Sequence, residues 1–150
     1  MTFTFILVED DPFVTEWVIR LIQKDIELRN KVEIVAVQSE REFLLRKNAL
    51  LTEEVTGIIV DLMLPFENGV SGEELAHMEP RGKIFHAGLR VLKDIAAWTG
   101  ARTVPVLLYT VNDRPSQDAL PQGLRLEYLR KDEPDEKLVR WIKRAMLREH

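Results

Sequence analysis

Residues 5–14, FILVEDDPFV, decide the fold, because they take an apolar run directly into three acids and a proline. The run at 3–8 is short and apolar, which predicts a strand buried on both faces. Asp11 can cap a helix whose first residue is Pro12, and apolar residues then repeat at helical spacing. The stretch therefore predicts a buried strand that leads at once into a helix.

The alternation of strand and helix continues along the chain. Further strands are predicted at 32–37, 57–64, 104–109 and 126–129, and further helices at 39–51, 88–98 and 135–148. Ser39 and Glu42 form a capping box at the start of one of these helices. Because buried strands separated by helices imply a parallel sheet covered on both sides, we predict an α/β fold with a doubly wound, five-stranded parallel sheet. At 150 residues the chain is expected to form one domain, 1–150.

The predicted helix at 135–148 carries an apolar stripe. The residues expected to face the core are Leu138, Val139, Ile142, Ala145 and Met146. Trp141 lies at the margin of this stripe, which predicts a place at the rim of the core, with contact to a partner as the alternative.

Two stretches fit the alternating pattern poorly. Residues 66–87 are long for a connection between a strand and a helix, and they predict an insertion with one helical turn at 72–78. His77 and His86 lie in this insertion and are interpreted as surface or packing residues, since no third metal ligand accompanies them. Between the last two strands, residues 113–123 contain two prolines and a glycine, which predicts an atypical helix that is short, displaced or mobile.

Composition excludes several classes of protein. The net charge of −4 gives no broad attraction for nucleic acid, so direct binding of nucleic acid is not expected. No apolar run approaches the roughly 20 residues of a membrane span, and no signal-like segment opens the chain. The absence of cysteine fits a reducing compartment, so we expect a cytoplasmic protein without membrane contact, in which oxygen or imidazole would hold any metal.

Polar residues follow the predicted strands at one edge of the sheet. Glu9 and Asp10 end the first strand and Asp61 lies near the end of the third, where converging carboxylates would repel one another unless a cation or a proton intervenes. Such an oxygen-only site suits Mg²⁺. Thr110 and Lys131 end the last two strands, and a hydroxyl and an ammonium beside a metal form a receptor for a phosphoryl group. The alternative for the acidic triplet is a helix cap that complements the helix dipole.

The combination resembles the receiver domains of two-component response regulators, with a chemotaxis-regulator-like, flavodoxin-like fold. VEDDP at 8–12 resembles the acidic pair of that family, and DLMLP at 61–65 resembles its phosphoacceptor segment. Thr110 falls at the hydroxyl position after the fourth strand, and YLRK at 128–131 resembles the segment that ends in the family's lysine. The match covers almost the whole chain apart from the insertion.

The resemblance implies a role for each matched residue. Asp61 would be the phosphoacceptor, and Lys131 and Thr110 would bind the phosphoryl oxygens. Thr110 and Tyr128 would form the switch that responds to phosphorylation. The Mg²⁺ cofactor would be bound by Asp10, Asp61 and the backbone carbonyl of Met63, with Glu9 acting through water.

Two departures from the family pattern affect these expectations. Asp132 follows Lys131 where the family usually has proline, often after a cis bond, so we expect a trans bond or a remodelled loop. Val111 follows Thr110 where a smaller residue is commoner. Together with Met63 and Asn112, it is expected to restrict water and slow self-dephosphorylation.

The resemblance thus implies a signalling phosphoprotein rather than an enzyme with other substrates, since the chain would catalyse only its own phosphorylation and dephosphorylation. Its expected partners are a histidine kinase or phosphotransfer protein, a downstream target protein, and a second copy of the chain in a homodimer. Output would use the face formed by 113–123, the last strand and the last helix, which would then order only on phosphorylation or binding, or it would use the insertion. The alternative is a tolerated surface loop without a role in output. No output domain is expected in this chain, which is either complete or excised from a larger protein. The alternatives are a pseudo-receiver scaffold that is never phosphorylated and a flavodoxin-like cofactor-binding or hydrolytic domain.

Overall fold

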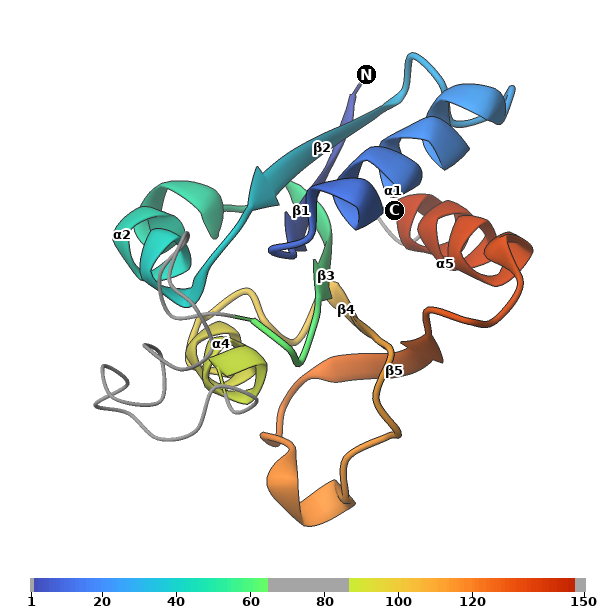
Figure 1. The fold of residues 1–150 in the computed structure, drawn as a ribbon. Coiled ribbons are helices and arrows are strands. Elements are labelled where there is room, and N and C mark those ends of the chain that lie inside the picture. Colours follow the sequence, from blue (N-terminus) through green and yellow to red (C-terminus); the bar gives the residue numbers. More distant parts are fainter. Residues whose placement is uncertain (1, 65–86, 148–150) are drawn as a thin grey trace.

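A computed structural model describes residues 2–64 and 87–147. Its strands form one parallel sheet in the order β2-β1-β3-β4-β5 (Figure 1). The strands are β1 (Phe3–Val8), β2 (Val32–Val37), β3 (Val55–Val60), β4 (Pro105–Thr110) and β5 (Arg125–Arg130). The predicted α/β fold with a five-stranded parallel sheet is confirmed, and the carboxyl ends of the strands share one edge.

Helices cover both faces of the sheet. They are α1 (Pro12–Lys24), α2 (Glu40–Leu50), α4 (Ala87–Ala96) and α5 (Asp135–Leu147). Figure 1 shows α1 and α5 on one side of the sheet and α2 and α4 on the other, and a separate apolar cluster fills the core on each side. No helix within 2–64 or 87–147 is both long and apolar enough to cross a lipid bilayer.

Both predicted helix caps are present. The Asp11 carboxylate accepts a hydrogen bond from the Phe13 backbone N–H at 2.9 Å, and Pro12 is the first residue of α1. The Ser39 hydroxyl accepts from the Glu42 backbone N–H at 3.1 Å. These contacts satisfy amide groups that have no partner inside their helices, so each helix begins where its sequence indicates.

The bounds of β3 and the place of Trp141 correct the sequence predictions. β3 begins at Val55 rather than at Gly57 and ends at Val60 rather than at Leu64. Gly57 lies inside the strand, where a Cβ atom would come within 2.7 Å of the Phe5 ring and 3.1 Å of the Trp141 ring. Trp141 is only 2% exposed and packs edge-on against Phe5, with ring centroids 6.0 Å apart, so it belongs to the core and not to its rim.

The connection between β4 and β5 is atypical, as predicted. Its only regular element is a 3₁₀ helix at Gln117–Ala119, and none of these three residues is buried. The predicted insertion at 66–87, its helical turn at 72–78 and both of its histidines lie outside the described residues, except for Ala87, where α4 begins. The other predicted bounds match the observed ones or differ from them by one or two residues, except that the predicted end of the last helix at 148 lies outside the described residues.

A buried ion pair joins α2 to α4. Arg90 Nε donates to both carboxylate oxygens of Glu40, at 2.9 and 3.2 Å, and Arg90 Nη2 donates to Oε1 at 2.9 Å. The Glu40 side chain is fully buried and that of Arg90 is 10% exposed. A planar guanidinium matched to a carboxylate in this way satisfies charges that would be costly to bury alone.

Candidate functional site

Three carboxylates converge at the carboxyl edge of the sheet. Glu9 and Asp10 follow β1 and Asp61 follows β3, and each places a carboxylate oxygen within 4.8 Å of the other two. Glu9 and Asp61 are almost completely buried, and Asp10 is partly exposed. The structure thus brings together the three acids that the sequence assigned to one site.

Lys131 directly follows β5 and reaches into this cluster. Its ammonium pairs with Glu9 Oε1 and with Asp61 Oδ2, the latter at 3.0 Å. The Lys131–Asp132 peptide bond is trans, as predicted, and the missing proline does not keep the lysine from the site. The Lys131 backbone N–H donates to the Thr110 carbonyl at 2.9 Å, which ties the end of β5 to the end of β4.

Backbone groups fix the two buried carboxylates. The second oxygen of Asp61, Oδ1, accepts from the Met63 N–H at 3.2 Å, and Glu9 Oε2 accepts from the Asp11 N–H at 3.1 Å. Gly88, in the first turn of α4, packs so closely on the segment after β3 that a Cβ atom there would lie 2.3 Å from the Asp61 carbonyl oxygen. The helix therefore supports the backbone of Asp61 directly, at a position that accepts no side chain.

The electrostatics of the cluster favour an additional positive charge. Burial and the nearby Asp61 charge raise the pKa of Glu9 to about 8, although Lys131 opposes the shift. Burial also raises the pKa of Asp10. Burial disfavours the charged form of Lys131, but Glu9 and Asp61 outweigh it and raise the lysine's pKa. Buried carboxylates that resist ionisation in this way would gain from a divalent cation.

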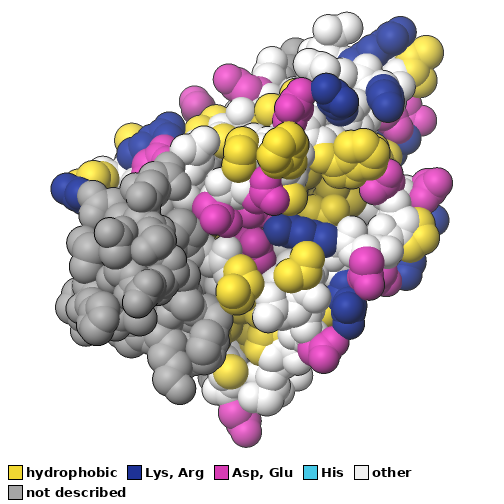
Figure 2. All heavy atoms as spheres, in the orientation of Figure 1, with side chains coloured by type: hydrophobic (Ala, Val, Ile, Leu, Met, Phe, Trp, Pro, Cys, Tyr) yellow, Lys and Arg dark blue, Asp and Glu magenta, His cyan; other side chains and the backbone are white. Residues whose placement is uncertain are grey.

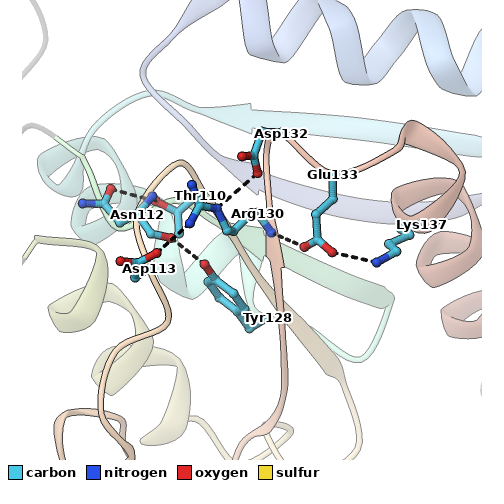
Figure 3. Close-up of polar contacts among 8 residues, drawn as sticks. All are labelled: Thr110, Asn112, Asp113, Tyr128, Arg130, Asp132, Glu133 and Lys137. Carbon is cyan, nitrogen blue, oxygen red and sulfur yellow. Dashed lines mark hydrogen bonds and ion pairs between the residues drawn. The ribbon is translucent and has the colours of Figure 1, made fainter.

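Thr110 and Tyr128 both contact the loop after β4 (Figure 3). Thr110 is fully buried, and its hydroxyl donates to Asn112 Oδ1 at 3.1 Å. The Tyr128 hydroxyl donates to the Asn112 carbonyl at 2.5 Å. The two residues of the predicted switch are therefore linked through one loop residue.

Hydrophobic side chains border the charged cluster. Val111 and Met63, which follow Thr110 and Asp61 closely in sequence, are 61% and 39% exposed. In Figure 2, acidic and basic side chains meet near the middle of the face shown, with hydrophobic side chains on both sides of them.

Comparison with solved structures identifies the fold. A signal receiver domain from Clostridium thermocellum superposes with a TM-score of 0.69 at 19% identity, covering 97% of this chain and 98% of that one. A chemotaxis protein from Vibrio cholerae gives a TM-score of 0.66 at 16% identity, covering 97% of this chain and 99% of that one. The chain has the response regulator receiver fold.

A further receiver-fold neighbour is described with a magnesium ion in its active-site cleft. This receiver domain of a sensor histidine kinase from Pseudomonas aeruginosa has a TM-score of 0.59 at 20% identity, and the match covers 97% of this chain and 98% of that one. No protein-family model matches the sequence, and no curated protein matches it significantly.

Two ion pairs between residues far apart in the sequence, Arg130–Asp113 and Arg90–Glu40, were not predicted from the sequence. Arg130 and Asp113 form an ion pair next to Asn112. From the sequence, Asn112 was expected only to affect the access of water to the site. Arg130 and Tyr128 are two residues apart on a strand, so their side chains lie on the same face of the sheet. This spacing could have indicated that both contact the loop after β4. The Arg90–Glu40 pair was missed although a charged residue among the apolar positions of a helix indicates a buried partner.

Proposed function

We propose that this chain is the phosphoacceptor receiver domain of a two-component response regulator, comprising residues 1–150. The observation that carries the proposal is the convergence of Asp61 with Lys131, Glu9 and Asp10 at one edge of the sheet. A buried carboxylate, an ammonium and two further acids are the groups that Mg²⁺-dependent phosphoryl transfer requires. The receiver fold supports this proposal.

The donor set fits a magnesium ion. Asp10, Asp61 and the Met63 carbonyl would hold it, with Glu9 acting through water, and all of these groups offer the hard oxygen ligands that Mg²⁺ prefers. When bound, the ion would neutralise the charge that builds up when one anion attacks another. The proximity of three carboxylates and the raised pKa of Glu9 support a cation at this place.

The proposed reaction transfers a phosphoryl group to Asp61. A carboxylate oxygen of Asp61 forms a bond to phosphorus while the bond from phosphorus to a histidine nitrogen of the kinase breaks, and that nitrogen keeps the electron pair. Lys131, already paired with Asp61 Oδ2, would bind a phosphoryl oxygen. Thr110 would turn its hydroxyl to another phosphoryl oxygen, and Tyr128 would then move inward.

The proposal implies protein partners in the cytoplasm. The donor is a histidine kinase or a phosphotransfer protein, and the phosphorylated chain acts on a downstream target or on a second copy of itself. The described surface around the β4–β5 connection, where only a three-residue 3₁₀ helix is present, is one site for such contacts.

The direct test is the intact mass of the protein after incubation with acetyl phosphate, with Mg²⁺ or with a chelator. We expect the mass of one phosphoryl group to be added with Mg²⁺ and none with the chelator, because acetate leaves only if the charge on the transferring group is neutralised. A folded sample that gains no mass in Mg²⁺ would contradict the proposal and favour a scaffold that is never phosphorylated.

Binding of Mg²⁺ is expected to stabilise the fold. At a concentration of 100 times its Kd, a ligand that binds only the native state adds about 2.7 kcal/mol, or roughly 5–10 °C in Tm for a chain of this size. Asp10→Asn should abolish the increase, which differential scanning calorimetry measures. Asp11→Asn is the matched control, since it removes the neighbouring charge but keeps a helix-capping side chain. Equal increases in both variants would argue against Asp10 as a ligand.

Val111 is expected to lengthen the life of the phosphorylated state. Its side chain is exposed beside Thr110, where it can shield the acyl phosphate from water. Val111→Ala should speed hydrolysis roughly two- to tenfold, which corresponds to about 0.4–1.4 kcal/mol in the barrier. The decay of the phosphorylated mass after removal of acetyl phosphate measures this rate. A lifetime that is unchanged or longer in the variant would show that Val111 does not restrict water.

A further inference from the structure

Two side chains of β5 hold the loop that follows β4. The Tyr128 hydroxyl donates to the Asn112 carbonyl at 2.5 Å, and Arg130 Nη1 donates to Asp113 Oδ1 at 2.6 Å (Figure 3). The two anchors act on consecutive residues of the loop. Asp113 itself is 91% exposed, so this ion pair and not burial fixes its side chain.

The same loop engages the hydroxyl of Thr110. Thr110 Oγ1 donates to Asn112 Oδ1 at 3.1 Å and accepts from the Asn112 backbone N–H at 3.4 Å. For this hydroxyl to bond a phosphoryl oxygen on Asp61, it must give up its donor contact to Asn112. The position of Asn112 therefore influences how readily Thr110 is released.

Arg130 is itself anchored to the connection between β5 and α5. Its Nε donates to Asp132 Oδ1 at 3.1 Å, and its backbone N–H donates to Glu133 Oε2 at 2.9 Å. Glu133 in turn pairs with Lys137 of α5 at 2.7 Å. The arginine thus joins the loop after β4 to the start of the last helix (Figure 3).

We propose that Arg130 is a positioning residue which, through Asp113 and Asn112, holds the Thr110 hydroxyl away from the phosphoacceptor site. This inference rests on the proposed function, because it concerns the residue that would bind the phosphoryl group. Breaking the Arg130–Asp113 pair frees the loop and makes the bound arrangement of Thr110 easier to reach. A ligand that resembles the phosphoryl group then binds more tightly, since less of its binding energy is used to displace the loop.

The size of the effect follows from the exposure of the pair. The side chains of Arg130 and Asp113 are 41% and 91% exposed, and exposed ion pairs are weak and sensitive to salt. Loss of the pair is therefore expected to tighten binding by roughly two- to fivefold at low ionic strength. The difference should disappear in about 0.5 M NaCl, where screening has already weakened the pair.

The test measures the affinity of beryllofluoride, a mimic of the phosphoryl group, in the presence of Mg²⁺ by calorimetric titration. The variants are Arg130→Met, Asp113→Ala and the double variant, with Arg130→Lys as the conservative replacement. Glu127→Gln is the matched control, because it breaks another exposed ion pair of β5, that with Arg144 at 3.2 Å. We expect Arg130→Met and Asp113→Ala each to bind beryllofluoride more tightly than wild type, and the double variant to show no further gain. The affinity of Arg130→Lys should return part of the way to the wild-type value. Glu127→Gln should bind with the wild-type affinity.

The outcomes separate this inference from the proposed function. If wild type and all variants bind beryllofluoride equally, Arg130 does not position Thr110, although the proposed function stands. Weaker binding and a lower Tm in Arg130→Met would show a purely structural role and would also overturn the inference. If the folded wild type binds no beryllofluoride, both the inference and the proposed function fail.

Discussion

Replacing Asp61 by Asn is expected to reduce phosphoryl incorporation from acetyl phosphate to background. The amide is close to the carboxylate in shape and can still accept the hydrogen bond from the Met63 N–H, so the fold should be kept. It lacks the anionic oxygen that pairs with Lys131 and would attack phosphorus. A loss of phosphoryl incorporation would therefore show that the Asp61 carboxylate takes part in the reaction, and not that the protein has unfolded. Intact mass measures the incorporation.

Asp118→Asn is the matched control for this experiment. Asp118 is an exposed aspartate of the 3₁₀ helix, so its replacement removes the same charge away from the carboxylate cluster. The control should incorporate phosphoryl groups at the wild-type rate. If Asp61→Asn incorporated as much as the control, a different residue would be the acceptor.

Replacing Arg90 by Met is expected to destabilise the protein by about 3–5 kcal/mol, because it removes a guanidinium that binds a fully buried carboxylate. Glu40→Leu should be similarly costly, since it leaves the buried arginine without that carboxylate. The double variant should lose much less than the sum of the two, because replacing a whole buried pair by apolar residues is often neutral. Urea unfolding of the four proteins measures these free energies.

An exposed ion pair provides the control for Arg90. Arg20 and Glu16 on α1 are paired at 2.8 Å, but both side chains are more than half exposed. Arg20→Met should therefore change stability by no more than about 0.5 kcal/mol. Strict additivity of the Arg90 and Glu40 substitutions would show that the two side chains do not stabilise each other.

Much of the fold was predictable because most strands are short apolar runs buried on both faces. β1 and β2 have the predicted bounds, and the cap at Asp11 fixed the start of α1. The start of β3 was missed because glycine usually interrupts a strand. Gly57 instead leaves space for the rings of Phe5 and Trp141. This space explains why Trp141 is buried in the core, although its position at the margin of the apolar stripe predicted a place at the rim.

The candidate site was predictable where the position of a residue depends only on strand order. Glu9, Asp10, Asp61, Thr110 and Lys131 all lie at or directly after strand ends, and parallel strands bring these ends to one edge. The contacts of Arg130 with Asp113 and of Arg90 with Glu40 join residues 17 and 50 positions apart. These residues do not lie at converging strand ends, so the sequence offers at most a sign that each arginine has a partner. Which carboxylate it pairs with depends on side-chain packing.

Chemical mapping identifies the residue that carries the phosphoryl group, which we predict to be Asp61. Borohydride reduces an aspartyl phosphate to homoserine, and trypsin releases Asp61 in the peptide 48–81, in which it is the only aspartate. After incubation with acetyl phosphate and Mg²⁺, we predict homoserine at position 61 and at no other aspartate. Homoserine elsewhere, or unmodified Asp61 in a protein that has gained the phosphoryl mass, would show that Asp61 is not the phosphoacceptor.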